Sequence, residues 1–449
     1  LKHLRGRERR RGGEISGEKR GILLGNCLVL LTKTYPYGKG EEFIEDEVPR
    51  LAEHFERIIL LATSVEDGAV QTRQVPENVT VHPIPARTIQ KSLVGNGLSL
   101  FPFTSCGGLV DDAEHNELRG NLKRRAFLLY FIAKSKAVYK ECSRLLRKYD
   151  LTAYDGVTFY SFWFYDVALA ALWLSGDCEN PVKKTVSRAH RYDLYPSAGS
   201  LGYLPLRRYL LERLDAVYPC SENGTSYLAE RYPPYARKVH TAYLGTRDYG
   251  PGPENTGDTI EIVSCCHIAP VKRVELLAQS LALLSGEKRK LHWVHFGDGA
   301  QLESLKAYAA EHLKFMKTDF PGSVKNEDLM KYYQKHPVDW FINTSSSEGL
   351  PVSIMEACSF GIPVIATDVG GTSEIVREGE TGFLLDADFK PEALAVLLRR
   401  LFRQKKGESA ALRAGCRRVW EESFCASSNF DRFAREISPQ DEDLSIASN

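Results

Sequence analysis

Residues 344–385 read TSSSEGLPVSIMEACSFGIPVIATDVGGTSEIVREGETGFLL, and this stretch decides the fold. An apolar strand candidate, 340–343, precedes it, and Pro351 fits the first turn of a helix, where a missing N–H costs nothing. A second strand candidate at 363–366 runs into the pair Gly370-Gly371. Strand, loop, helix, strand and glycine loop in this order predict one edge of a parallel sheet at which the loops meet.

Two carboxylates in this stretch, Glu348 and Glu356, have seven residues between them. We expect Glu348 in the loop before the helix and Glu356 inside the helix, beside free N–H groups that suit a phosphate. Carboxylates there can accept hydrogen bonds from sugar hydroxyls, so we interpret the edge as a nucleotide-sugar site. Taken singly, either glutamate fits equally well as a charge on a solvated helix face.

Three segments, SSSEGLPVSIMEA, GIPVIATDVGGTSEIV and GETGFLL, resemble the donor-site signature of retaining glycosyltransferases of family four. The resemblance implies an α/β GT-B fold, with two Rossmann-like domains facing a central cleft and C-terminal helices crossing back to the first domain. It also implies retaining, metal-independent transfer from a nucleoside-diphosphate sugar to a glycan, lipid-linked or other hydroxyl acceptor, in bacterial-type polysaccharide or glycolipid synthesis, with no cofactor. Glu348 would hold the sugar, Glu356 the ribose, and the helix start the diphosphate, through Gly349, Leu350, Pro351, Val352 and Ser353.

The resemblance continues at CCHIAPVKR, where relatives carry an arginine and then a lysine that clamp the diphosphate. This chain has Lys272 and an added Arg273, but His267 stands in the place of the arginine. An imidazole can donate one hydrogen bond and cannot reproduce a guanidinium fork. The alternative for Lys272 is a solvated residue in the first turn of a helix.

Two features of the first half belong to the same expected site. A strand candidate at 25–32 leads into a turn with Gly38 and Gly40, like the opening of a Rossmann-like half, although an ordinary strand–helix turn fits as well. VSRAHRYDLY is similar to a segment of related enzymes whose histidine faces the donor sugar, which makes His190 a candidate catalytic residue with Glu348 and Lys272. The alternative is that His190 is a structural residue, as a lone histidine more often is.

The expected organisation has six parts. These are a disordered basic tail (1–21), an acceptor domain (22–248), a linker (249–258), a donor domain (259–407), crossover helices (408–437) and a disordered tail (438–449). Within the acceptor domain we expect a last strand at 237–244 and an irregular segment at 88–120 that reads the acceptor or is idle.

Composition restricts the partners and the compartment. A net charge of +1 does not favour nucleic acid, and ten cysteines without a CxxC pair indicate buried thiols in a reducing compartment. The chain begins with Leu rather than Met, which suggests a trimmed or incomplete start, and its first residues lack the apolar core of a secretory signal. We therefore expect a cytoplasmic protein. A basic helix at 121–148 fits either peripheral contact with an anionic membrane or a solvated face.

Three other classes of protein are alternatives. A non-catalytic GT-B partner subunit, binding a glycosylated protein or another transferase, draws support from His267 alone. A Rossmann dehydrogenase would need GxGxxG after the first strand, and YPYGKGEE does not supply it. A GT-B phosphorylase would be much longer and would carry a cofactor lysine.

Overall fold

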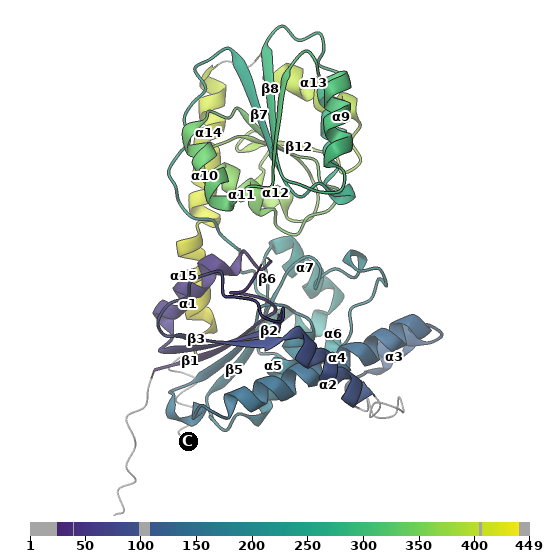
Figure 1. The fold of residues 1–449 in the computed structure, drawn as a ribbon, viewed down its shortest axis with the longest axis vertical. Helices are drawn as coiled ribbons and strands as arrows, with labels where there is room; N and C mark the ends of the chain where they lie inside the picture. The colour runs from purple at the N-terminus through teal and green to yellow at the C-terminus, as the bar shows by residue number, and fades with distance from the viewer. Residues whose placement is uncertain (1–24, 39, 98–107, 404–405, 440–449) are drawn as a thin grey trace, which may run out of the picture.

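The computed structural model describes residues 25–38, 40–97, 108–403 and 406–439. They form two lobes joined at a narrow waist, and each lobe is built around a six-stranded parallel sheet (Figure 1). This confirms the expected two-domain α/β architecture. The predicted tail 1–21 and all but the first two residues of the predicted tail 438–449 lie outside the described residues.

The first lobe contains a sheet in the order β3-β2-β1-β4-β5-β6. Its strands are β1 (Cys27–Thr32), β2 (Arg57–Val65), β3 (Val79–Pro85), β4 (Val157–Ser161), β5 (Lys183–Ala189) and β6 (Ala216–Pro219). Its helices are α1 (Ile44–His54), α2 (Ala86–Gly97), α3 (Asp112–Leu118), α4 (Leu122–Leu146), α5 (Asp166–Asp177), α6 (Arg207–Arg213) and α7 (Glu222–Arg231).

Strand β1 shows why this sheet is covered on both faces. Every residue of CLVLLT is buried, and alternate side chains enter two different cores because side chains alternate along a strand. Leu28 and Leu30 pack with α1 and α15, whereas Val29 and Leu31 pack with α4 and α5. A continuous apolar strand of this kind is typical of a parallel sheet between helix layers.

The second lobe repeats this plan with a sheet in the order β12-β11-β10-β7-β8-β9. Its strands are β7 (Thr259–Cys265), β8 (Lys290–Phe296), β9 (Lys317–Gly322), β10 (Trp340–Asn343), β11 (Val364–Thr367) and β12 (Gly382–Leu385). Helices α8 (Val274–Ala282), α9 (Leu302–His312) and α13 (Pro391–Leu401) pack on one face. The other face carries α10 (Asn326–Lys335), α11 (Val352–Ser359) and α14 (Lys406–Ser423), and α12 (Thr372–Ile375) lies at the carboxyl edge.

The chain returns to the first lobe through α14 and then α15 (Ala426–Ile437), the yellow helices on one side of Figure 1. Two contacts fix the waist between them: Trp420 donates from Nε1 to the Thr246 hydroxyl at 2.7 Å, and Asn429 donates to the Leu244 carbonyl at 2.9 Å. Gly245 has no room for a side chain, because a Cβ there would lie 2.4 Å from the Cα of Ala426. Helix α15 then packs on α1.

Two sequence predictions about the first lobe are wrong. Residues 239–245 form no strand, because they bond to β6 through the N–H groups of His240 and Ala242 and then turn to the crossover. Much of 88–120 is helical rather than irregular, since α2 continues to Gly97 and α3 begins at Asp112. The remainder, 98–107, lies outside the described residues.

Candidate functional site

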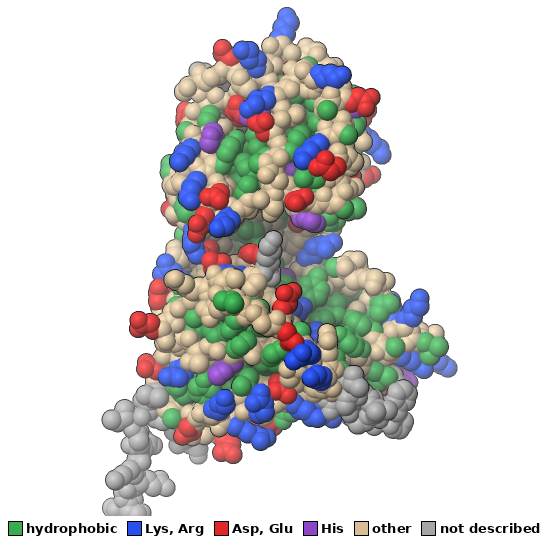
Figure 2. Space-filling model, viewed as in Figure 1, with side chains coloured by type: hydrophobic (Ala, Val, Ile, Leu, Met, Phe, Trp, Pro, Cys, Tyr) green, Lys and Arg blue, Asp and Glu red, His purple; other side chains and the backbone are tan. Residues whose placement is uncertain are grey.

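The candidate donor site lies at the carboxyl edge of the second sheet, where the loops after β7, β10 and β11 meet. In Figure 1 this edge, with α11 and α12, faces α7 of the first lobe, and Figure 2 shows the surface hollowed where the two lobes meet. The loops after β7 and β10 are interlocked: Ser346 donates its N–H to the Val271 carbonyl at 2.8 Å, and the Thr344 hydroxyl contacts the Lys272 and Arg273 carbonyls.

The centre of this edge is an ion pair. Lys272 donates from Nζ to Oε1 of Glu348 at 2.7 Å, and the Asn343 amide donates to the same oxygen at 3.3 Å. Glu348 is 9% exposed, so its charge is largely shielded from water. The fold thus brings together an ammonium and a carboxylate from residues 76 positions apart in the sequence. Both residues are expected in one site from the sequence.

The start of α11 offers free N–H groups to this edge. Pro351 precedes the helix without a side-chain cap, and the first intrahelical bonds come from the N–H groups of Ile354 and Met355. The N–H groups of Val352 and Ser353 therefore have no partner inside the helix. Together with the helix dipole, they form a place for an anionic group.

The glycine pair after β11 packs directly on the loop that carries Glu348. Gly370 adopts a left-handed conformation (φ +58), and a Cβ there would lie 2.1 Å from the Glu348 carbonyl oxygen. Gly371 donates its N–H to the Gly349 carbonyl at 2.7 Å. The pair is required for this close backbone approach and so fixes the Glu348 loop.

Glu356 lies one turn inside α11 and is half-buried. Burial raises its pKa to about 7, although a 2.6 Å hydrogen bond from the Asn326 amide opposes that shift. The carboxyl group is therefore poised between its neutral and charged forms near neutral pH. Asn326 begins α10, so two helices meet at this carboxylate.

The guanidinium of Arg273 binds to the protein itself rather than presenting a free pair of donors to an anion. Its guanidinium donates to three carbonyl oxygens, those of Thr344 (2.8 Å), Ser345 (3.0 Å) and Ala387 (2.7 Å). The residue also has a left-handed backbone (φ 49), which is costly for any residue except glycine. This geometry favours a structural role, in which Arg273 holds the loops around Lys272.

The two histidines of interest have different environments. His267 is exposed at the start of the loop after β7. His190 is buried between the rings of Phe162 and Trp163, with centroid distances of 4.7 and 4.6 Å. Among the described residues, neither ring nitrogen of His190 has a hydrogen-bond partner, since the nearest carboxylate oxygen, Oδ2 of Asp193, lies 4.0 Å from Nδ1. A buried imidazole whose nearest carboxylate oxygen is 4.0 Å away still has ring nitrogens that a substrate could satisfy.

The glycine turn of the first lobe is bound by the protein itself. Gly38 and Gly40 both have positive φ, as their turn requires. The buried carboxylate of Glu41 accepts the N–H groups of residues 33, 34 and 35 at 2.7–2.8 Å, and Arg73 donates to the Gly38 and Gly40 carbonyls. These amides therefore hold an internal anion. Neither Glu41 nor Arg73 is predictable from the sequence, since nothing local distinguishes them from ordinary surface charges.

An aromatic cluster was also missed. The ammonium of Lys33 lies 4.9 Å from the Trp163 ring centroid and 4.4 Å from that of Tyr192, and it donates to the Tyr192 hydroxyl. Burial lowers the pKa of Lys33. Trp163 also contacts His190, so the cluster continues from the candidate catalytic histidine across the carboxyl ends of β1, β4 and β5.

The two lobes touch at the donor loop. Arg191 donates from Nε to the Ser347 hydroxyl at 2.9 Å, and a Cβ on Gly349 would lie 3.1 Å from that of Arg191. On the same side, the two carboxylate oxygens of Glu374 accept the first N–H groups of α7, from Glu222 (2.8 Å) and Asn223 (2.9 Å). His190 and Glu348 are each adjacent in sequence to one member of the Arg191–Ser347 contact.

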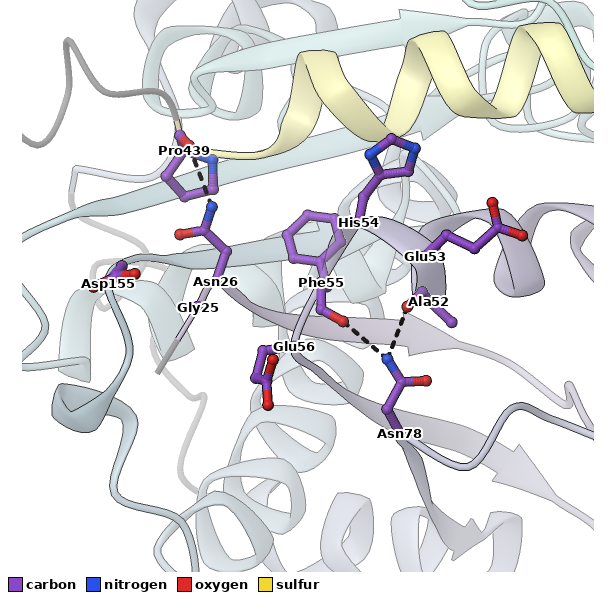
Figure 3. A pocket seen from close by; sticks show the side chains of 10 residues that line it. All are labelled: Gly25, Asn26, Ala52, Glu53, His54, Phe55, Glu56, Asn78, Asp155 and Pro439. Carbon is purple, nitrogen blue, oxygen red and sulfur yellow. Dashed lines mark hydrogen bonds between the residues drawn. The ribbon is translucent and has the colours of Figure 1, made fainter. Parts of the chain in front are cut away.

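Another cavity lies at a different place in the molecule. A cavity of about 640 Å³ lies at the amino ends of the first-lobe strands, between Asn26, His54, Asn78 and Pro439 (Figure 3). Its amides are already used, since Asn78 donates to the Ala52 and Phe55 carbonyls. In open parallel sheets ligands bind at the carboxyl ends of the strands, so we place the candidate site at the opposite edge.

Within residues 25–38, 40–97, 108–403 and 406–439, there is no group of three or more His, Cys, Asp or Glu side chains placed to hold a metal ion. In the same part of the chain, every helix is too short or too polar to cross a membrane.

The fold and this edge define a GT-B architecture, and comparison with known proteins agrees. HepE of Anabaena, solved in complex with UDP and glucose, superposes with a TM-score of 0.59 at 15% identity, over 91% of this chain and 98% of HepE. The sucrose-phosphate synthase of Thermosynechococcus elongatus gives a TM-score of 0.64 at 16% identity, over 92% and 98% of the two chains. At these identities the likeness shows the fold.

The second lobe carries the sequence similarity. Residues 252–416 match the family model described as Glycosyl transferases group 1. The O-antigen biosynthesis glycosyltransferase WbnH of Escherichia coli is 35% identical over 128 residues, which are 26% of this chain and 34% of WbnH. The GDP-mannose-dependent alpha-mannosyltransferase of Mycolicibacterium smegmatis is 30% identical over 154 residues, or 34% and 38%. The chain thus spans about a third of the length of the curated relatives it matches.

Proposed function

We propose that this chain is a retaining glycosyltransferase of family four, which moves a sugar from a nucleoside-diphosphate sugar to a hydroxyl acceptor in glycan or glycolipid synthesis. The observation that carries the proposal is the Lys272–Glu348 pair, held at 2.7 Å beside the uncapped start of α11. The group 1 match over 252–416 and the UDP and glucose bound to HepE support the donor class.

The chemistry follows from the charges at this edge. As the bond between the anomeric carbon and the diphosphate oxygen breaks, negative charge grows on the diphosphate and positive charge on the sugar. Lys272 and the free N–H groups of Val352 and Ser353 stabilise the first charge, and Glu348 stabilises the second. The acceptor oxygen then bonds to the anomeric carbon on the face that the diphosphate leaves, and its proton passes to the leaving phosphate oxygen.

The remaining groups take supporting roles in this proposal. Glu356 accepts hydrogen bonds from the ribose, and the buried ring of His190, whose nitrogens make no hydrogen bond within the described residues, contacts the donor sugar. Arg273 supports the loops rather than the diphosphate, because its guanidinium is committed to three carbonyls. These residues compensate the charge of the donor in this proposal, and no cofactor takes part in any step.

The acceptor belongs to the first lobe in this proposal, and an anionic membrane is one place for it. Helix α4 exposes Leu122, Lys123 and Tyr130, with 78% of Leu122 and 51% of Tyr130 accessible. Lys134 does not contribute to this face, because its ammonium pairs with the buried Asp166 at 2.9 Å. The surface proposed to meet anionic lipid is therefore the amino-terminal end of α4.

The test is a donor screen. Purified protein is incubated without acceptor with UDP-, GDP- and ADP-sugars, and melting temperature and slow hydrolysis are both measured. The proposal predicts that one nucleotide raises the melting temperature and that its sugar is released. Binding without any release over long incubation would favour the non-catalytic partner subunit instead, for which His267 in the arginine place is the supporting observation. Absence of binding by every nucleotide would contradict both.

A further inference from the structure

Arg191 follows β5 of the first lobe, yet its side chain lies on the loop that joins β10 to α11 in the second. Its Nε donates to the Ser347 hydroxyl at 2.9 Å, and a Cβ on Gly349 would lie 3.1 Å from the Cβ of Arg191. The side chain is therefore in contact with the residues on either side of Glu348. The contact between the lobes uses Nε and leaves the two terminal nitrogens, Nη1 and Nη2.

The terminal edge of this guanidinium is free within the part of the chain that the structure describes. There, Nη1 and Nη2 of Arg191 make no hydrogen bond or ion pair, and neither belongs to the buried polar atoms that lack a partner. The residue is half-buried, so this edge is open to a ligand. The acid nearest in the sequence, Asp193, is engaged elsewhere, since its carboxylate accepts the N–H groups of His190 at 2.6 Å and Phe164 at 2.7 Å.

The basic residues expected at the diphosphate leave part of its charge unmatched. Lys272 is paired with Glu348 at 2.7 Å, and Arg273 gives its guanidinium to three carbonyl oxygens. His267 is exposed, and a neutral imidazole offers a single donor. The start of α11 is equivalent to about half a positive charge, whereas the diphosphate of a nucleotide sugar carries negative charge on both phosphates. A further cation at this edge would therefore stabilise the bound donor.

The position of Arg191 favours one of the two phosphates. Its guanidinium lies at Ser347, the residue before Glu348, whereas the free N–H groups of Val352 and Ser353 lie further along the loop, at the start of α11. In the proposed function Glu348 holds the transferred sugar, so the phosphate on the Arg191 side is the one bonded to that sugar. This phosphate also gains negative charge as its bond to the sugar breaks, and a fixed cation beside it stabilises that charge.

We propose that Arg191, supplied by the first lobe, binds the donor phosphate that is bonded to the transferred sugar. This inference rests on the proposed function and adds a contact with the donor to the contact with Ser347. Nε keeps its bond to the Ser347 hydroxyl and so fixes the guanidinium, while Nη1 and Nη2 donate to two phosphate oxygens. Because this cation and the start of α11 come from different lobes, the bound diphosphate links the two lobes.

The experiment compares the nucleoside diphosphate that the donor screen selects with its monophosphate, by calorimetry on the full chain. The diphosphate carries the phosphate in question, and the monophosphate lacks it. Arg191→Gln is expected to weaken diphosphate binding by about tenfold, the effect of one charge-assisted hydrogen bond, and to change monophosphate binding by less than about twofold. Arg191→Lys keeps a positive charge without the fork, so it is expected to recover part of the diphosphate affinity.

Arg213→Gln is the matched control, because Arg213 is exposed on α6 and pairs with Glu212 at 2.7 Å, and it should bind both nucleotides as wild type does. Ser347→Ala removes the acceptor of Nε and keeps the Arg191 charge, so it should lose less diphosphate affinity than Arg191→Gln. Equal weakening of both nucleotides by Arg191→Gln, or unchanged diphosphate binding, would overturn the inference and leave the proposed function standing. Failure of the wild type to bind any nucleotide would contradict the proposed function itself.

Discussion

Nε of Arg191, in the first lobe, lies 2.9 Å from the hydroxyl of Ser347, in the second. Ser347 immediately precedes Glu348, and Arg191 immediately follows His190. The contact between the lobes is therefore made by the immediate neighbours of both candidate catalytic residues, so the same contact helps to place their side chains. A GT-B protein that closes on its donor would use such a contact to align the two halves of its site.

Arg191→Ala should weaken this alignment without unfolding the protein, since Arg191 is only half-buried. We expect the KM for the donor to rise by about threefold to tenfold, the effect of losing one hydrogen bond of ordinary strength. Steady-state kinetics with the donor found in the screen would measure it. Arg213→Ala serves as the control, and a KM unchanged from wild type in Arg191→Ala would separate the lobe contact from donor binding.

Glu374→Gln tests the second contact between the lobes. The carboxylate accepts two N–H groups at the start of α7 and its charge favours that helix end, whereas an amide keeps one acceptor and no charge. We expect the lobes to separate in solution, seen as a larger radius of gyration by small-angle scattering without nucleotide. Glu392→Gln, at an exposed position of α13, should leave the radius unchanged. Identical scattering from both variants would show that this contact does not hold the lobes together.

Donor affinity should depend on pH through Glu356. With a pKa raised to about 7 by burial, this carboxyl gains charge between pH 6 and pH 8, and only the charged form accepts two ribose hydroxyls. A nucleotide sugar keeps constant charge over that range, so its affinity should increase with pH. Glu356→Gln should bind more weakly and with a flat profile. A profile in the variant as steep as in the wild type would remove Glu356 from the site.

The same shift affects stability, with the opposite sign. The ordinary pKa of a glutamate is 4.5 and the pKa of Glu356 in the folded protein is about 7, so the folded state binds more protons between these values. The contribution of Glu356 to stability therefore falls as pH rises from about 4.5 to about 7. Glu356→Gln should lose this dependence, which denaturant unfolding at several pH values would measure.

Arg273→Gly separates support of the loops from binding of the diphosphate. Glycine relieves a left-handed backbone, worth about 1–2 kcal/mol, but three hydrogen bonds from a charged group are lost, each worth about 1.5–3 kcal/mol. We expect a lower melting temperature and, in the protein that remains folded, nearly normal nucleotide affinity. Normal stability with a large loss of affinity would return Arg273 to the diphosphate clamp.

The second lobe was predictable because its site is local in sequence. Glu348, the start of α11 and the glycine pair lie within one segment, and their spacing follows from strand, loop and helix geometry. Lys272 lies in one further loop, the loop after β7. Its pairing with Glu348 needed only that β7 and β10 are neighbours in a parallel sheet.

The first lobe was less predictable because its groups are joined by tertiary contacts. Glu41 meets the N–H groups of residues 33–35 through a turn, and Trp163 and Tyr192 meet Lys33 from two other strand ends. Arg273 was expected at the diphosphate because charge alone suggested it, and only the geometry shows the three carbonyls around it. Residues 237–244 have strand-like composition, yet the crossover competes for their backbone, with Thr246 bridging to Cys425.

Glu348→Gln, measured for nucleotide affinity and transfer rate on one preparation, tests the proposed donor site most directly. The substitution keeps the shape of a side chain that lies before α11 and pairs with Lys272. We predict that free nucleoside diphosphate binds almost as it does to wild type, while turnover with saturating donor falls by about two to three orders of magnitude, because the lost charge acts on the transferred sugar in the transition state. Collapse of nucleotide affinity with turnover preserved would contradict the assignment of Glu348 to the sugar and Glu356 to the ribose.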